Sequence, residues 1–188
     1  RMNGRNFGTQ KVLEGIEAAE RAGYRPLKIN SVVQRGVNDH TVVDLARHFK
    51  ERGHIVRFIE YMDVGTRNGW KLDQVVSADE IAAAVDSELP LEPVEPNYRG
   101  EVALRYRYRD GGGEIGIIAS VTRPFCGDCT RLRLSPEGSI YTCLFATAGT
   151  DLRGPLRAGA DDAELEAMVR RVWAVRDDRS SEERASMT

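Results

Sequence analysis

The chain has 188 residues, 41% of them hydrophobic, and a formal net charge of −2. This suffices for one domain with a proper core or for two small ones. The nearly balanced charge excludes a global basic field that would attract nucleic acid, and no stretch approaches the roughly 18 apolar residues of a membrane span. The chain has three cysteines, two of them in C-x-x-C spacing. Secreted proteins usually have an even number of cysteines paired in disulfides, so this count favours a protein of the reducing cytoplasm.

The first half of the chain alternates helix and strand patterns. Residues 9–21 place apolar side chains on one helical face, and residues 26–33 alternate like a strand with Lys28 and Asn30 on the same face. A second helix pattern follows, and residues 55–62 form a second strand of the kind found in buried parallel sheets. This order predicts parallel pairing with a right-handed crossover, and two strands alone indicate a piece of a larger α/β layer or barrel.

The second half has a different order of predicted helices and strands. Residues 77–89 form a helix pattern that opens with a capping box, Ser77 and Glu80. Short strand patterns separated by turns then predict an antiparallel sheet. Glycines 111–113 are expected to form a hairpin turn rather than a phosphate loop, because no helix pattern follows them. Residues 162–175 form a last helix, whose apolar stripe is expected to pack in the interior.

All three cysteines lie in the segment FCGDCTRLRLSPEGSIYTCLF. The C-x-x-C spacing of Cys126 and Cys129 allows two thiolates to reach one metal centre from a tight turn. A hairpin in the strand pattern that follows would return Cys143 to the same place. Alternation along that strand puts Arg131 and Arg133 on one face, directly behind the second cysteine.

The residues alone leave three interpretations of these thiols open. A closed zinc site needs a fourth ligand, and the histidines, His40, His48 and His54, all lie in the first half, where each is expected on the surface. A redox C-x-x-C usually opens a helix in a βαβ unit, whereas a strand pattern follows here. A [4Fe–4S] cluster usually has four thiolates, so three would leave one iron open to a substrate, and adjacent arginines would recognise an anion. Spacing favours zinc and iron–sulfur equally.

Three segments carry a resemblance to a known family: PLKINSVVQRGVND, VRFIEYMDVG and TRPFCGDCTRLRLSPEGSIYTCLF. In this order they resemble the GTP 3′,8-cyclases of molybdenum cofactor biosynthesis, which are radical S-adenosylmethionine lyases, and the resemblance covers nearly the whole chain. It implies an α/β fold in which residues 1–65 are the C-terminal portion of an incomplete (β/α) radical-SAM barrel. Residues 66–188 would be an α+β extension with a small antiparallel sheet, which carries a second iron–sulfur cluster.

The resemblance also implies the chemistry of the parent enzyme. One [4Fe–4S] cluster would cleave S-adenosylmethionine to a radical, and the other would bind GTP through its open iron. The product would be (8S)-3′,8-cyclo-7,8-dihydroguanosine 5′-triphosphate, which a cyclic pyranopterin monophosphate synthase consumes. The implied partners are GTP and that synthase, without nucleic acid or membrane, and a homodimer in the cytoplasm is an assembly that the resemblance allows.

The same resemblance assigns roles to residues of this chain. Three cysteines would hold the second cluster: Cys126, Cys129 and Cys143. Four basic residues would bind GTP: Lys28, Arg57, Arg131 and Arg133. Two residues at strand ends would approach S-adenosylmethionine: Asn30 and Met62. Without the resemblance, the residues of the first half are equally well explained as ordinary rim or core side chains.

The chain departs from the family pattern in two places. It has no C-x-x-x-C-x-x-C motif, which in the family holds the radical-generating cluster, and it ends in SSEERASMT rather than in the double-glycine tail of the family. The chain is therefore expected to be a fragment that supplies the GTP-binding half and is inactive by itself. There are two alternatives. One is a zinc- or cluster-containing nucleotide-binding module without catalysis, and the other is another radical enzyme with an auxiliary cluster, which would act on a peptide. The arginines of CTRLRL favour a phosphorylated substrate over a peptide.

Overall fold

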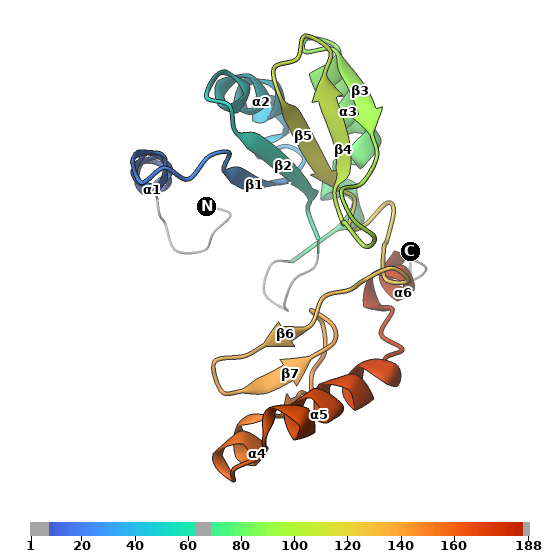
Figure 1. The fold of residues 1–188 in the computed structure, drawn as a ribbon. Helices are drawn as coiled ribbons and strands as arrows, with labels where there is room; N and C mark the ends of the chain where they lie inside the picture. Colours follow the sequence, from blue (N-terminus) through green and yellow to red (C-terminus); the bar gives the residue numbers. More distant parts are fainter. Residues whose placement is uncertain (1–7, 63–68, 186–188) are drawn as a thin grey trace. The chain divides into compact units, whose positions relative to one another are not determined.

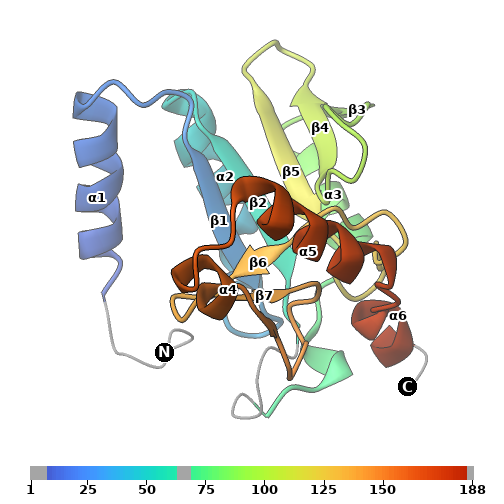
Figure 2. The same ribbon diagram turned by 60° about the horizontal axis from the view of Figure 1, so that its bottom comes forward.

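The computed structural model describes residues 8–62 and 69–185, with side chains up to residue 183. The described residues form two compact units, whose α-helices and most of whose strands are labelled in Figure 1 and seen from a second side in Figure 2. Unit 1 holds residues 8–61, 70–97 and 103–119, and unit 2 holds residues 62, 69, 98–102 and 120–185.

Unit 1 is built on a five-stranded mixed sheet with the strand order β1-β2-β5-β4-β3. Its strands are β1 (Lys28–Val33), β2 (Ile55–Glu60), β3 (Leu91–Val94), β4 (Leu104–Tyr108) and β5 (Glu114–Ile118). β2 runs parallel to both β1 and β5, whereas β4 is antiparallel to β5 and to β3. The predicted parallel pairing of the first two strands is confirmed, and the radical-SAM barrel stays a prediction.

The second half of the chain does not form a single antiparallel sheet. β4 and β5 were expected to belong to it, but they join the sheet of β1 and β2 in unit 1. The physical reason is the apolar segment at β5, whose residues Ile115–Ile118 are all buried, as in a strand covered on both sides. The glycines between β4 and β5 form the predicted hairpin turn, in which the Tyr108 N–H donates to the Gly113 carbonyl.

The core of unit 1 lies between one face of the sheet and two helices. The helices of this unit are α1 (Gln10–Arg21), α2 (Val42–Glu51) and α3 (Ala78–Asp86), with the 3₁₀ helices η1 (Asp39–Thr41) and η2 (Leu72–Gln74). α2 and α3 pack against β2 and β5, and Phe49, Phe58 and Ile81 are buried there. α3 begins with the predicted capping box, in which the Ser77 hydroxyl accepts from the Glu80 N–H and the Glu80 carboxylate accepts from the Ser77 N–H.

Unit 2 contains a small antiparallel sheet, as predicted, with the strand order β6-β7-β8. Its elements are β6 (Arg133–Leu134), β7 (Ser139–Tyr141), β8 (Thr150–Asp151), α4 (Arg153–Arg157), α5 (Asp162–Ala174) and α6 (Ser180–Ala185). Because β6 begins only at Arg133, Arg131 lies outside the strand. The predicted shared strand face of the two arginines is therefore not formed.

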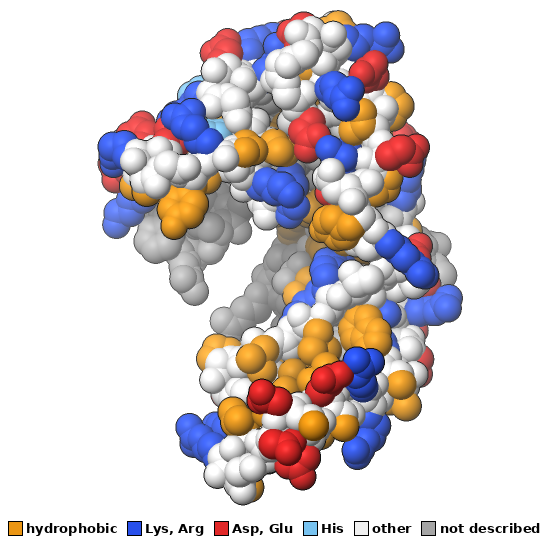
Figure 3. Space-filling view, in the orientation of Figure 1, with side chains coloured by type: hydrophobic (Ala, Val, Ile, Leu, Met, Phe, Trp, Pro, Cys, Tyr) orange, Lys and Arg blue, Asp and Glu red, His pale blue; other side chains and the backbone are white. Residues whose placement is uncertain are grey.

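The apolar core of unit 2 is small. Among its described residues, the buried apolar side chains are Cys126, Cys129 and Ile140. The stripe on α5 is half-buried rather than interior, because few apolar side chains of this unit are available to cover it. Other apolar side chains are exposed, among them Leu134 and Val175, and Figure 3 shows apolar side chains at the surface of this unit. The buried interior of unit 2 is thus centred on the C-x-x-C cysteines.

The predicted division of the chain falls between residues 65 and 66, which lie outside the described residues, so it stays a prediction. Residues 70–97 and 103–119 belong with β1 and β2 in unit 1, where β3, β4 and β5 extend the same sheet. The middle of the chain therefore packs with its beginning rather than with its end.

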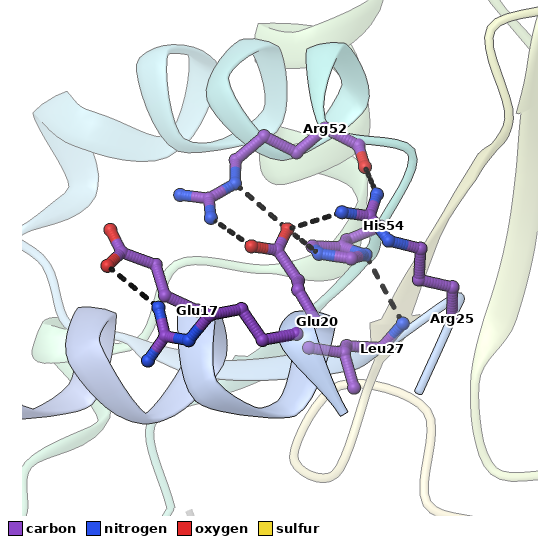
Figure 4. A network of polar contacts seen from close by, with 7 residues as sticks. Glu17, Glu20, Arg25, Leu27, Arg52 and His54 are labelled. Atoms are coloured by element: carbon purple, nitrogen blue, oxygen red, sulfur yellow. Dashed lines mark hydrogen bonds and ion pairs between the residues drawn. The ribbon is translucent and has the colours of Figure 1, made fainter. Parts of the chain in front are cut away.

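A network of polar contacts joins α1 to the starts of β1 and β2 (Figure 4). The Glu20 carboxylate accepts hydrogen bonds from the Arg52 guanidinium and lies 2.6 Å from Nε2 of His54. The Leu27 N–H donates to Nδ1 of His54 over 3.3 Å, so Nε2 carries the proton that points to Glu20. The His54 side chain is fully buried, and the expectation that it lies on the surface is wrong because α1 supplies a buried carboxylate as its partner.

This network depends on the ionised form of Glu20. The Arg52 hydrogen bonds, opposed by burial and assisted by His54, lower the pKa of Glu20 from 4.5 to about 2. A carboxyl whose pKa is lower in the folded state stabilises the fold above its unfolded pKa. That contribution is present above about pH 4.5 and is lost as the pH falls towards 2.

Replacing Glu20 with Gln should lower the melting temperature at pH 7, because the amide cannot accept from Arg52 and His54 as an ion. The difference from the wild type should shrink as the pH falls from 4.5 towards 2. Thermal unfolding followed by circular dichroism over this range measures both effects. The matched control is Glu17→Gln on the same helix, whose carboxylate is half-exposed and lies 4.0 Å from Arg21. Equal losses in the two variants would contradict the role assigned to the network.

Candidate functional site

Three of the predicted site residues lie on one face of the sheet in unit 1. Lys28 and Asn30 are exposed in β1, and Arg57 in β2 is half-buried, between Val56 and Phe58, which point into the core. Asn30 is directly opposite Arg57 in the parallel register, and Arg57 Nε donates to Asn30 Oδ1 over 3.0 Å. Asn30 therefore orients the guanidinium on the face of the sheet opposite the core helices.

Gly116 is a further residue of this face and was not among the predicted site residues. It is opposite Arg57 in the register of β2 with β5. A Cβ at Gly116 would lie 3.3 Å from Cγ of Arg57 and 3.2 Å from Cβ of Ala103, so the bare glycine makes room for the stem of Arg57. A glycine inside the apolar pattern EIGII is a known sign of such a close approach, and this signal was available in the sequence.

Met62 is the predicted site residue closest to the undescribed segment. It is half-buried and follows the end of β2 by two residues. It belongs to unit 2, whereas Asn30 belongs to unit 1. The joint role of Met62 and Asn30 therefore stays a prediction.

The C-x-x-C segment forms the predicted tight turn. The Cys129 N–H donates to the Cys126 carbonyl over 3.2 Å, and both side chains are buried free thiols. Gly100 lies against the turn, since a Cβ there would be 2.6 Å from the Asp128 carbonyl oxygen. No helix begins at this turn in the described chain, as the strand pattern predicted, which disfavours the redox interpretation.

Arg131 and Arg133 flank the turn in different ways. The Arg131 guanidinium lies 5.0 Å from the centre of the Phe125 ring, and Arg133 Nη1 donates to the Arg131 carbonyl over 3.4 Å. Burial raises the pKa of the Cys129 thiol, but hydrogen bonds from the backbone and side chain of Arg131, with the charges of Arg131 and Arg176, outweigh burial and lower that pKa overall. This environment favours the thiolate, which is the form that binds metals.

Cys143 lies in the same unit, two residues after β7, and is half-buried. Its thiol donates to Oγ of Ser180 over 3.4 Å, and the Phe145 N–H donates to its sulfur over 3.5 Å. Within residues 8–62 and 69–183, no three His, Cys, Asp or Glu side chains are gathered into a metal-binding group. The chemistry of the three free thiols fits an iron–sulfur cluster, while the gathering of Cys143 with the other two stays a prediction.

Residues after the end of α5, including one in α6, also contact the cysteine turn. Arg176 Nη2 donates to the Cys126 carbonyl over 3.3 Å, and the Gly127 N–H donates to Oε1 of Glu182 over 3.1 Å. No residue after 175 had a predicted role in the site. These contacts span about fifty residues of chain, so no local pattern could have predicted them.

Comparison with known proteins identifies the family. The family model described as Molybdenum Cofactor Synthesis C matches residues 54–182. The chain belongs to this family. It is 55% identical over 178 residues to a protein of Acidothermus cellulolyticus named GTP 3′,8-cyclase, and this match covers 93% of the chain and 49% of that protein.

Further relatives carry the same name. The chain is 49% identical over 187 residues to a GTP 3′,8-cyclase of Xanthomonas axonopodis pv. citri, and 45% identical over 188 residues to one of Staphylococcus carnosus. Both matches cover 100% of the chain and 55% of the relative. The chain thus spans about half the length of the curated relatives it matches, as expected for the C-terminal part of such a protein. In the described part of the chain, no helix has the length and apolar character needed to cross a membrane.

Replacing Gly116 with Ala should reduce the free energy of unfolding by about 1–3 kcal/mol, because a methyl group must be inserted between Ala103 and Arg57. The matched control is Gly15→Ala, in the exposed part of α1, where an added Cβ has nothing within 4 Å. That change should instead stabilise the protein by about 0.5–1 kcal/mol, because alanine loses less entropy in a helix. Urea unfolding followed by circular dichroism measures both, and a Gly116→Ala variant as stable as the wild type would show that the space is not needed.

Proposed function

We propose that this chain is the GTP-binding, cluster-carrying part of a GTP 3′,8-cyclase, a radical S-adenosylmethionine lyase of molybdenum cofactor biosynthesis. The family match and the names of the relatives support this function. The observation that carries it at the level of residues is the C-x-x-C turn, where buried thiols lie beside Arg131. A thiolate donor set next to an arginine suits an anionic substrate held at a metal centre.

Cys126, Cys129 and Cys143 are the proposed ligands of a [4Fe–4S] cluster. When bound, the cluster would supply an iron with an open position for the substrate. The lowered pKa of Cys129 favours the ligating form, and Arg131 and Arg176 supply the positive charge that stabilises it. The small core of unit 2 also supports a resident metal group, because domains with little buried apolar surface usually need a metal or disulfides for stability.

The substrate-binding residues come from both units. Arg131 and Arg133 in unit 2, with Lys28 and Arg57 in unit 1, would bind the triphosphate of GTP through charge-assisted hydrogen bonds. Asn30 would orient Arg57 through their 3.0 Å hydrogen bond and, with Met62, approach S-adenosylmethionine. How these residues are brought together around one substrate is part of the proposal.

The parent enzyme would need more than this chain contains. The sequence lacks the C-x-x-x-C-x-x-C motif that would hold the radical-generating cluster, so the chain alone is proposed to be inactive. The product, (8S)-3′,8-cyclo-7,8-dihydroguanosine 5′-triphosphate, would pass to a cyclic pyranopterin monophosphate synthase in the cytoplasm.

The metal is the first test. Anaerobic reconstitution of the 188-residue chain with iron and sulfide should give one cluster per chain, since the chain has three cysteines in all. Iron, sulfide and zinc are measured together, and Cys143→Ser should bind less iron than the wild type. The cluster should be lost in air because one iron position is open. Stoichiometric zinc without iron would support the non-catalytic zinc module instead.

The arginines are the second test. In the complete enzyme, Arg131→Ala or Arg133→Ala should weaken GTP binding roughly ten- to a hundredfold, which corresponds to the loss of one hydrogen bond to a charged group. Equilibrium dialysis measures the affinity, and iron content should stay unchanged because neither arginine is a ligand. Arg170→Ala is the control, since that exposed arginine of α5 pairs with Glu166 on the same helix. If both variants bind GTP as the wild type does, the arginines are structural.

A further inference from the structure

One short segment of unit 2 contacts both parts of the cysteine site. Three side chains of this segment, Arg176, Ser180 and Glu182, are called the C-terminal clasp. Arg176 donates to the Cys126 carbonyl, and Glu182 accepts from the Gly127 N–H. Ser180 lies 3.4 Å from the sulfur of Cys143. Figure 1 shows α6 beside the loop that carries the C-x-x-C turn.

We propose that the C-terminal clasp positions the three cysteines for the metal group, with Ser180 as the hydrogen-bond donor to the ligated sulfur of Cys143. This inference rests on the proposed function, because it assumes that the cysteines are ligands. The three residues are positioning residues, since they contact the ligands and the backbone that carries them rather than a substrate. Together they connect two cysteine segments that are well separated in the sequence.

The contact of Ser180 with Cys143 suits a ligated sulfur. As a thiol, Cys143 donates its proton to the hydroxyl oxygen of Ser180. A metal-bound thiolate has no proton, so its sulfur can only accept, and a hydroxyl can rotate to donate. Hydrogen bonds to ligand sulfurs are among the factors that set the reduction potential of an iron–sulfur cluster. Ser180 is therefore expected to influence the potential and not only the fold.

The Arg176 side chain is fixed by contacts other than its hydrogen bond to the cysteine turn. Its guanidinium lies 5.2 Å from the centre of the Trp173 ring, its Nε is 3.8 Å from the Asp178 carboxylate, and its Nη2 also donates to the Asp178 carbonyl. The side chain is only 13% exposed. This largely buried guanidinium, held by three groups, is a rigid donor to the Cys126 carbonyl. The Glu182 carboxylate accepts from the N–H of the next residue, Gly127.

The contacts of the C-terminal clasp are expected to increase the affinity of the cysteines for the metal. Residues that hold the ligands of a metal from outside typically change metal affinity by about 10- to 100-fold when they are replaced. Arg176 and Glu182 act on the backbone of the turn, so their loss should release the metal more readily. Ser180 acts on a sulfur, so its loss should change the electronic properties of the cluster.

The first experiment uses Ser180→Ala, Ser180→Thr and the neighbouring control Ser181→Ala in the anaerobically reconstituted 188-residue chain. The reduction potential is measured by a redox titration followed by electron paramagnetic resonance. Ser180→Ala should keep its iron but show a more negative potential, because a hydrogen bond to sulfur favours the reduced cluster. Ser180→Thr should restore the wild-type value because it keeps the hydroxyl, and Ser181→Ala should not change it.

The second experiment measures iron loss to a chelator. Arg176→Ala and Glu182→Ala should weaken iron retention by about 10-fold or more, while the control Arg170→Ala should behave as the wild type. If the wild type takes up no iron, the proposed iron–sulfur cluster is contradicted, and this inference is contradicted with it. If the wild type binds iron and the clasp variants match it in both potential and retention, the clasp alone is overturned. A potential that changes in Ser180→Ala but is not rescued by Ser180→Thr would also contradict the role of the hydroxyl.

Discussion

The parallel register of β2 with its two neighbours determines which side chains lie together on the sheet face that carries Lys28, Asn30 and Arg57. Arg57 is opposite Asn30 in β1 and opposite Gly116 in β5 at the same time. One neighbour orients its guanidinium and the other makes room for its stem. A slip of one residue would turn Arg57 into the core and expose Val56, because successive side chains of a strand point to opposite faces.

This register is held where the strands begin. The Ile55 N–H donates to the Leu27 carbonyl over 2.9 Å, and the Leu27 N–H donates to His54. Both backbone groups of Leu27 are thus used by two consecutive residues at the start of β2. Glu20 fixes the His54 ring from α1, so the ion-pair network at one end of the strands supports the position of Arg57 two residues further on.

Unit 2 depends on a different kind of constraint. Two of the three described apolar residues buried there are the C-x-x-C cysteines, so little hydrophobic stabilisation is available apart from the thiols. Hydrogen bonds to residues far along the chain hold the turn as well, since Arg176 donates to the Cys126 carbonyl and Glu182 accepts from the Gly127 N–H. In a unit with so small a core, a metal held by the thiols would contribute directly to the stability of the fold.

The features that could be predicted from the sequence are local, and those that could not be predicted are contacts between distant segments. The capping box of α3, the glycine turn between β4 and β5, and the C-x-x-C turn each depend on a few consecutive residues. The burial of His54 depends on Glu20, which is 34 residues away. The pairing of β5 with β2 and the contact of Ser180 with Cys143, 37 residues apart, likewise leave no periodic signal in the sequence.

The limits of the family match make the role of β1 clearer. The matched residues, 54–182, include Arg57, the cysteines and Arg131, but not Lys28 or Asn30. The Arg57 side chain nevertheless hydrogen-bonds to Asn30, and the whole of β2 pairs with β1. The relatives, by contrast, match across nearly all of the chain. A piece that keeps the Arg57–Asn30 hydrogen bond therefore includes β1, and Glu20, which contacts His54 at the start of β2, also lies before the matched segment.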